Sequence, residues 1–121
     1  AVDQVEARIL RGDVVRGRGG DPRGLYREAI AAAGERGLPL QAAAAWQRIG
    51  KEDLRADQPD AARAAFEEAI ALYAQGDPGH QLPWLTYNLA TAIEAQGRID
   101  EALARYGDVL ELAAGLADSS L

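Results

Sequence analysis

The chain has 121 residues, 48% of them apolar, with no cysteine, one histidine and a net charge of −6. This composition excludes disulfides, thiol chemistry and metal clusters built from several histidines or cysteines, and the acidic balance argues against nucleic acid as a partner. The apolar content suffices for the core of one domain, while no apolar run approaches the roughly 20 residues needed to span a bilayer. We therefore predict no metal, no cofactor and no membrane partner.

Abundant alanine and few β-branched residues favour helices along the whole chain. Apolar residues at helical spacing predict six helices arranged in pairs, and the first helix of each pair is expected at about 2–16, 40–55 and 82–96. Asp60 and Asp100 are the predicted N-caps of the last two second helices, because an aspartate accepts a bond from an unpaired amide of the first turn.

Three segments repeat one pattern at an offset of 40 residues: DPRGLYREAIAA (21–32), DAARAAFEEAIAL (60–72) and DEALARYGDVLEL (100–112). Ala62 then aligns with Ala102, and Phe66 aligns with Tyr106. A small residue lets two helices approach closely, and a large ring one turn later fills the space between them. These aromatic side chains are therefore expected to lie in the core.

The segments upstream are expected to keep the same register, which aligns Ile9 with Ile49 and Leu89. Each repeat unit is thus a pair of helices, and the units are expected at about 3–36, 43–76 and 83–116 of a single domain covering residues 1–121. Two helices recurring at this period are typical of an α-solenoid, so the predicted fold is all-α with three helix-turn-helix units. Because the chain lacks methionine even at its start, we expect it to be a piece of a longer protein.

The stretch NLATAIEAQGRIDEALARYGDVLEL, residues 88–112, resembles a tetratricopeptide repeat. It matches the family's packing positions through Leu89, Ala90, Ile93, Gly97, Ala102, Tyr106 and Val109, and the second unit matches through Trp46, Ile49, Gly50, Ala62, Phe66 and Ala69. The first unit keeps Ile9, Tyr26 and Ala29, but has Pro22 where the family has a small residue. The 40-residue period exceeds the family's usual length of about 34, which implies longer helices or longer loops.

The resemblance implies that the first helices of successive units line a concave inner surface. Arg48, Lys51 and Arg55 share one face of such a helix, and the 40-residue offset places Arg8 beside Arg48 and Arg11 beside Lys51. The candidate partner-binding residues are Arg8, Arg11, Gln47, Arg48, Lys51, Arg55, Trp84, Tyr87, Asn88 and Thr91. Guanidinium groups hold carboxylates in a bidentate fork, so this surface is suited to an extended acidic peptide.

A structural alternative is that Arg48 and Lys51 only pair with Glu52, Glu94 or a neighbouring loop, since such surface pairs contribute about 0–1 kcal/mol. The family's best-known ligand pattern, a clamp for the terminal carboxylate of a peptide, is matched here only at scattered positions. Trp84 follows Pro83 at the expected start of a helix, where we predict that it packs against the preceding unit. Projection into the groove is the alternative for Trp84.

Other motifs have simple structural interpretations. His80 lies in the inter-unit loop DPGHQLP without a second histidine or a nucleophile near it, so it is interpreted as a loop residue. The stretch GRGG at residues 17–20 is interpreted as a turn between two helices. A phosphate-binding loop would need a preceding strand and a following Lys-Ser/Thr, and this stretch has neither.

The predicted function is a protein-interaction scaffold without enzyme activity, located in the cytoplasm, that binds a protein or peptide on its concave face. Self-association is an alternative, because solenoids need polar caps and the last helix carries an apolar set: Leu103, Leu110, Leu112 and Leu116. A regulatory or sensory domain of a larger signalling protein is a further alternative.

Overall fold

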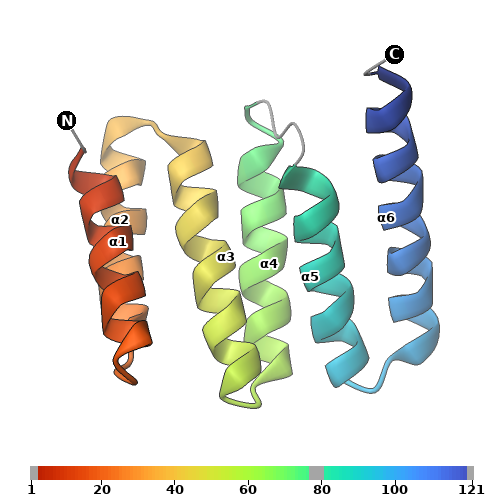
Figure 1. Ribbon diagram of the computed structural model, residues 1–121, viewed down its shortest axis with the longest axis horizontal. Helices are drawn as coiled ribbons and strands as arrows, with labels where there is room; N and C mark the ends of the chain where they lie inside the picture. Colours follow the sequence, from red (N-terminus) through yellow and green to blue (C-terminus); the bar gives the residue numbers. More distant parts are fainter. Residues whose placement is uncertain (1–2, 77–80, 120–121) are drawn as a thin grey trace.

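The computed structural model describes residues 3–76 and 81–119, which form six α-helices and no strand. The helices are α1 (Gln4–Gly17), α2 (Arg23–Arg36), α3 (Pro39–Arg55), α4 (Pro59–Tyr73), α5 (Gln81–Ala95) and α6 (Ile99–Ser119). In Figure 1 they follow one another across the molecule, from α1 and α2, which overlap at one end of this view, to α6 at the other. The prediction of an all-α fold with six helices is confirmed.

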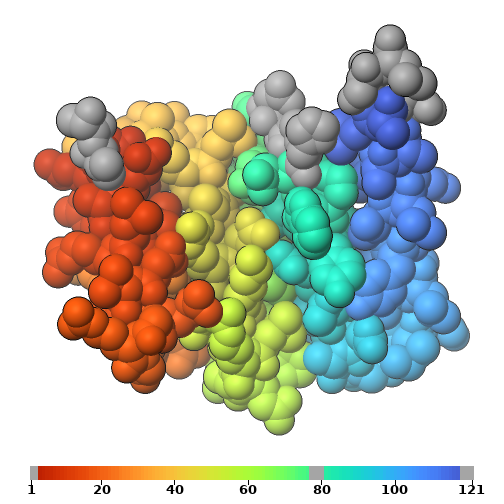
Figure 2. All heavy atoms as spheres, viewed as in Figure 1, coloured from red at the N-terminus to blue at the C-terminus, as the bar shows by residue number. Residues whose placement is uncertain are grey.

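Each helix packs mainly against the helices that precede and follow it in the chain. In addition, α1 contacts α3 and α3 contacts α5, and the second helices α4 and α6 meet through the ion pair of Arg63 with Glu101. The first helices α1, α3 and α5 form much of the face turned to the viewer in Figure 2. This packing is consistent with a helical repeat.

The three first helices end in the same way. Residues Gly19, Asp57 and Gly97 have φ values of 84°, 58° and 83°, in the left-handed region that allows the chain to reverse. The next amide in each case bonds a carbonyl five residues back, as in Gly20 to Val15 at 2.9 Å and Arg98 to Ile93 at 3.2 Å. These equivalent ends are separated by 38 residues between the first and second units and by 40 between the second and third.

The 40-residue register predicted for α1 is therefore wrong by two positions. The linker between α1 and α2, residues 18–22, is longer than the linkers 56–58 and 96–98, and the extra residues shift α1 relative to α3. Counting from the equivalent helix ends, Leu10 rather than Arg8 occupies the position of Arg48. Asp13, by the same count, occupies the position of Lys51.

Close approach between the two helices of a unit follows the corrected register. A Cβ atom at Gly12 would lie 2.5 Å from Cε1 of Tyr26, and one at Gly50 would lie 2.5 Å from Cε1 of Phe66. Both rings are fully buried. Glycine at these positions lets the ring of the second helix lie directly on the backbone of the first. The prediction had given the role of the small residue to Ala62 and Ala102 of the second helices and had not assigned it to these two glycines.

Two arginines related by the 40-residue offset connect each unit to the next. Arg23 of α2 donates to Asp53 of α3 at 3.0 Å, and Arg63 of α4 pairs with Glu101 of α6 at 2.6 Å. Asp53 is buried, and the contact with Arg23 offsets the cost of removing its carboxylate from water. The guanidinium of Arg63 holds the pKa of the Glu101 carboxyl below its usual value.

The predicted N-caps are wrong. Helix α4 begins at Pro59 with Gln58 at the cap position, and α6 begins at Ile99, which places Asp60 and Asp100 inside the first turns. Proline suits the first helical position because its missing N–H would be unpaired there anyway. Asp60 instead accepts a hydrogen bond from Nε2 of Gln96 at 2.7 Å.

Candidate partner-binding groove

A groove of about 860 Å³ crosses the face formed by α1, α3 and α5, and we call it the basic groove. Its charged lining residues are the cations Arg16, Arg48, Lys51 and Arg55 and the carboxylates Asp13 and Glu52. Amide and aromatic side chains complete its polar and aromatic lining: Gln47, Gln81, Asn88, Trp84, Tyr26 and Tyr73. Positive charges exceed negative charges by two in this groove, although the whole chain has a net charge of −6.

Six of the ten predicted binding residues line the basic groove: Gln47, Arg48, Lys51, Arg55, Trp84 and Asn88. The other four do not line it. Arg8 donates to the carbonyl of Gln4 at 3.0 Å, and the hydroxyl of Thr91 donates to the carbonyl of Tyr87 at 3.0 Å. Arg8 and Arg11 were predicted as binding residues from the 40-residue offset, which does not hold for α1 because its linker is longer.

Arg16, Asp13 and Glu52 are groove residues that the sequence-based prediction did not include. The sequence feature that could have indicated them is the glycine-rich linker after α1. Its two additional residues bring Asp13 and Arg16 opposite the charged face of α3. A register taken only from the apolar positions could not reveal this shift.

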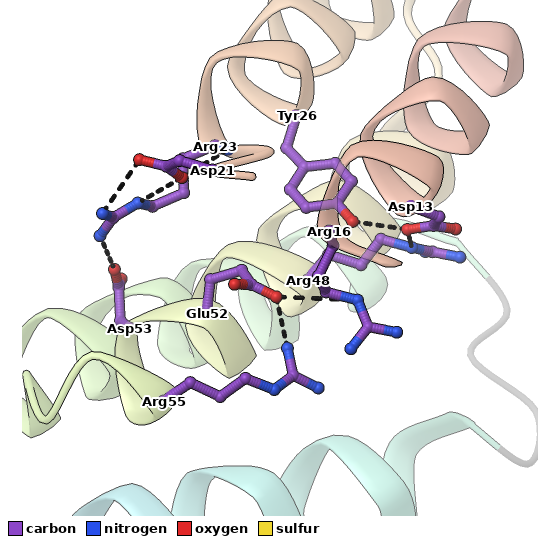
Figure 3. Close-up of polar contacts among 9 residues, drawn as sticks. All are labelled: Asp13, Arg16, Asp21, Arg23, Tyr26, Arg48, Glu52, Asp53 and Arg55. Atoms are coloured by element: carbon purple, nitrogen blue, oxygen red, sulfur yellow. Dashed lines mark hydrogen bonds and ion pairs between the residues drawn. The ribbon is translucent and has the colours of Figure 1, made fainter. Parts of the chain in front are cut away.

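One charged network centres on Asp13 (Figure 3). Its Oδ1 accepts a hydrogen bond from the hydroxyl of Tyr26 at 2.5 Å and another from Nε of Arg48 at 2.9 Å. Burial of the ring and the adjacent carboxylate raise the pKa of Tyr26 far above its usual value, so the phenol stays a donor. Asp13 thus links the core aromatic ring to an arginine on the groove surface.

A second network centres on Glu52, which Figure 3 shows between two arginines. Its Oε1 lies 3.8 Å from Nε of Arg16 and also pairs with Nη1 of Arg55. The carboxylate is largely buried, whereas both guanidinium groups are about half exposed. Glu52 therefore holds two cations at the groove surface while leaving their outer edges open to a ligand.

Lys51 differs from these arginines. Among the residues that the structure describes, no carboxylate forms an ion pair with the ammonium group of Lys51. Desolvation by surrounding side chains lowers the pKa of Lys51, and the positive charges of Arg48, Arg55 and Arg16 lower it further. An anion at this point would relieve that repulsion.

The α5 side of the basic groove is aromatic. Trp84 is 64% exposed and meets Tyr87 edge to face, with ring centroids 6.2 Å apart. The prediction that Trp84 packs against the preceding unit is wrong, because Leu85 and Thr86 occupy the buried face of α5 and turn Trp84 outward. The alternative, projection into the groove, agrees with its position in the lining of the basic groove.

The predicted self-association residues fall into two groups. Leu103 and Leu110 are 63% and 73% exposed on the outer side of α6. Leu112 and Leu116 are half-buried and line a different cavity between α4, α5 and α6.

Two further sequence candidates had been interpreted as turn or loop residues. Gly17 is the last residue of α1 and residues 18–20 form the turn described above, which agrees with the prediction of a turn between two helices, while His80 lies outside the described residues. In the ranges 3–76 and 81–119, no three acidic or histidine side chains gather as metal ligands would. None of the helices in these ranges has the length and apolar character needed to cross a membrane.

Comparison with protein-family models finds no match to this chain, and comparison with curated proteins finds none either. The resemblance to tetratricopeptide repeats therefore rests on the sequence positions named for it and stays a prediction.

Proposed function

We propose that this chain is a non-catalytic protein-interaction module of the tetratricopeptide type, which binds an acidic segment of a partner in the basic groove. The supporting observation is the excess of positive charge that lines the basic groove in a protein of net charge −6, with Lys51 close to three arginines. An acidic ligand would be drawn to this groove by charge, while the rest of the surface repels it.

The ion pairs in the groove assist such binding. Because Asp13 and Glu52 fix the positions of Arg48, Arg16 and Arg55, less side-chain freedom is lost when a ligand carboxylate reaches these guanidinium groups. Each exposed charge contact contributes only about 0–1 kcal/mol, so affinity depends on several contacts made together. Binding is therefore expected to weaken as salt rises.

Charge reversal at Lys51 tests the proposal. We expect Lys51→Glu to weaken binding of a fluorescent decapeptide of Glu, Asp and Gly by about tenfold, a change of about 1.4 kcal/mol, with little change in thermal stability. The measurement is fluorescence anisotropy at low and physiological salt.

The matched control is Arg27→Glu, an identical charge reversal at an exposed position of α2 outside the groove. Equal weakening by both substitutions would mean that only net charge matters, and the groove assignment would fail. Absence of binding by the unmodified protein at low salt would reject the acidic ligand itself.

Self-association is a second candidate, favoured by one observation. Ile99, Leu103 and Leu110 are all more than half exposed, and their spacing of four and seven residues puts them on one stripe of α6. If a second copy covers this stripe, sedimentation velocity will show a mass that rises with concentration, and Leu110→Asp will return it to the monomer value. A mass independent of concentration in the unmodified protein would eliminate this candidate.

A further inference from the structure

A third cavity, distinct from the basic groove and from the cavity between α4, α5 and α6, lies between α5 and α6 beside Trp84, and we call it the apolar cavity. It has a volume of about 640 Å³, within the range of roughly 300–1,000 Å³ typical of ligand pockets. None of its lining side chains carries a formal charge, and its floor includes Val109, Ala113 and Leu116 of α6. This lining is suited to an aliphatic or aromatic side chain and not to a carboxylate.

Trp84 joins the two cavities. Its side chain lines both the basic groove and the apolar cavity, and its edge-to-face partner Tyr87 lines only the latter. Both rings expose a large part of their surface to solvent, at 64% and 46%. Tryptophan and tyrosine in such a position commonly supply much of the binding energy of an interface.

The two cavities differ in the chemistry that they recognise. The basic groove has an excess of positive charge and an unpaired ammonium group, while the apolar cavity offers mainly hydrophobic surface. A ligand that is acidic throughout fits the first and leaves the second filled with water. A ligand with an apolar side chain beside its acidic run would remove both Trp84 and that side chain from water.

We infer that the partner segment is bipartite: an acidic run lies in the basic groove, and a large apolar residue next to it enters the apolar cavity across Trp84. This inference rests on the proposed function, because charge complementarity with the groove determines which ligand reaches the cavity. The acidic run provides steering and salt sensitivity, and the apolar residue provides most of the residence time.

Four labelled peptides test this arrangement by fluorescence anisotropy. The first is the acidic decapeptide, and the second and third carry an added Leu-Phe pair at its amino or its carboxyl end. The fourth keeps the better-placed Leu-Phe pair but has Gln and Asn in place of Glu and Asp. We expect one of the two Leu-Phe acidic peptides to bind about tenfold more tightly than either the acidic or the neutral peptide.

Substitutions on α6 localise the gain. Ala113→Asp introduces a charge into the apolar cavity and is expected to reduce the affinity for the Leu-Phe acidic peptide to that for the acidic peptide alone. Ala114→Asp is the matched control, since Ala114 is the next residue of the same helix, is exposed, and does not line the cavity. It should retain the full gain, and circular dichroism checks that both variants are equally helical.

Several outcomes would overturn the inference, and they are distinguishable from failure of the proposed function. If the acidic peptide binds but Leu-Phe adds nothing, the inference fails and the proposed function stands. If the neutral Leu-Phe peptide binds as tightly as the acidic one that carries it, the two cavities do not act together. If no acidic peptide binds, both fail. A dimer that Ala113→Asp alone dissociates would instead assign the apolar cavity to a second copy.

Discussion

The second and third units place an aromatic ring at the same repeat position, yet the two rings have different surroundings. Phe66 of α4 is fully buried, whereas Tyr106 of α6 is only partly buried. Helix α4 packs closely against two neighbours, α3 and α5, while α6 packs closely against α5 and meets α4 through contacts that include the Arg63–Glu101 ion pair. The sequence position within a repeat thus fixes which residue faces its own partner helix, and the neighbouring units decide how much of it is buried.

The chemistry of each ring agrees with its environment. Phe66 has no polar atom to satisfy and contacts the backbone at Gly50, where a Cβ atom would lie 2.5 Å away. At the equivalent position of the third unit the small residue is Ala90, and the hydroxyl of Tyr106 donates to Glu94 at 2.8 Å. A tyrosine suits the site because its ring packs inward while its hydroxyl reaches a polar group at the edge.

The largest difference between the two units should appear on truncation of these rings. We expect Phe66→Ala to lower the free energy of unfolding by about 3–5 kcal/mol, because it leaves a closed cavity in the core. Tyr106→Ala should cost about 1–2 kcal/mol, since water can enter the space left behind. Denaturant unfolding followed by circular dichroism measures both.

Equal costs for the two truncations would contradict the comparison. They would mean that Tyr106 is as fully covered in solution as Phe66, by a second copy or by some other part of the protein. Repeating the measurement over a range of concentrations separates these cases, because only association makes the cost depend on concentration.

The fold could be predicted from the sequence because it depends on local, periodic signals. Helical spacing of apolar residues and the 40-residue alignment of Phe66 with Tyr106 were sufficient to predict six helices and to place the three first helices within two residues of their observed bounds. The register of α1 could not be obtained in this way. Its apolar residues match α3 plausibly at more than one offset, and only the left-handed helix ends at Gly19 and Asp57 show which offset holds.

The candidate site was predicted in part for the same reason. Arg48, Lys51 and Arg55 lie on a single helix, so their common face follows from helical spacing alone. Arg16 and Asp13 come from a different helix, and whether they meet α3 depends on the linker length and on close packing at Gly12. Contacts between elements need tertiary structure, and the sequence of one chain does not encode them as a simple pattern.

A smaller effect, the addition of one methyl group at a glycine, tests how closely the two helices of the second unit approach each other. Alanine normally stabilises a helix interior relative to glycine by about 0.5–1 kcal/mol, and Gly107→Ala on α6, with no atom near the new methyl group, should show that gain. Gly50→Ala adds the same methyl group against the buried ring of Phe66, and overpacking is expected to lower stability by about 1–3 kcal/mol. The opposite signs are the prediction, and thermal and denaturant unfolding of the two variants measures them. If Gly50→Ala were also stabilising, the ring of Phe66 would have room to move away, and the tight contact that distinguishes the second unit from the third would not exist.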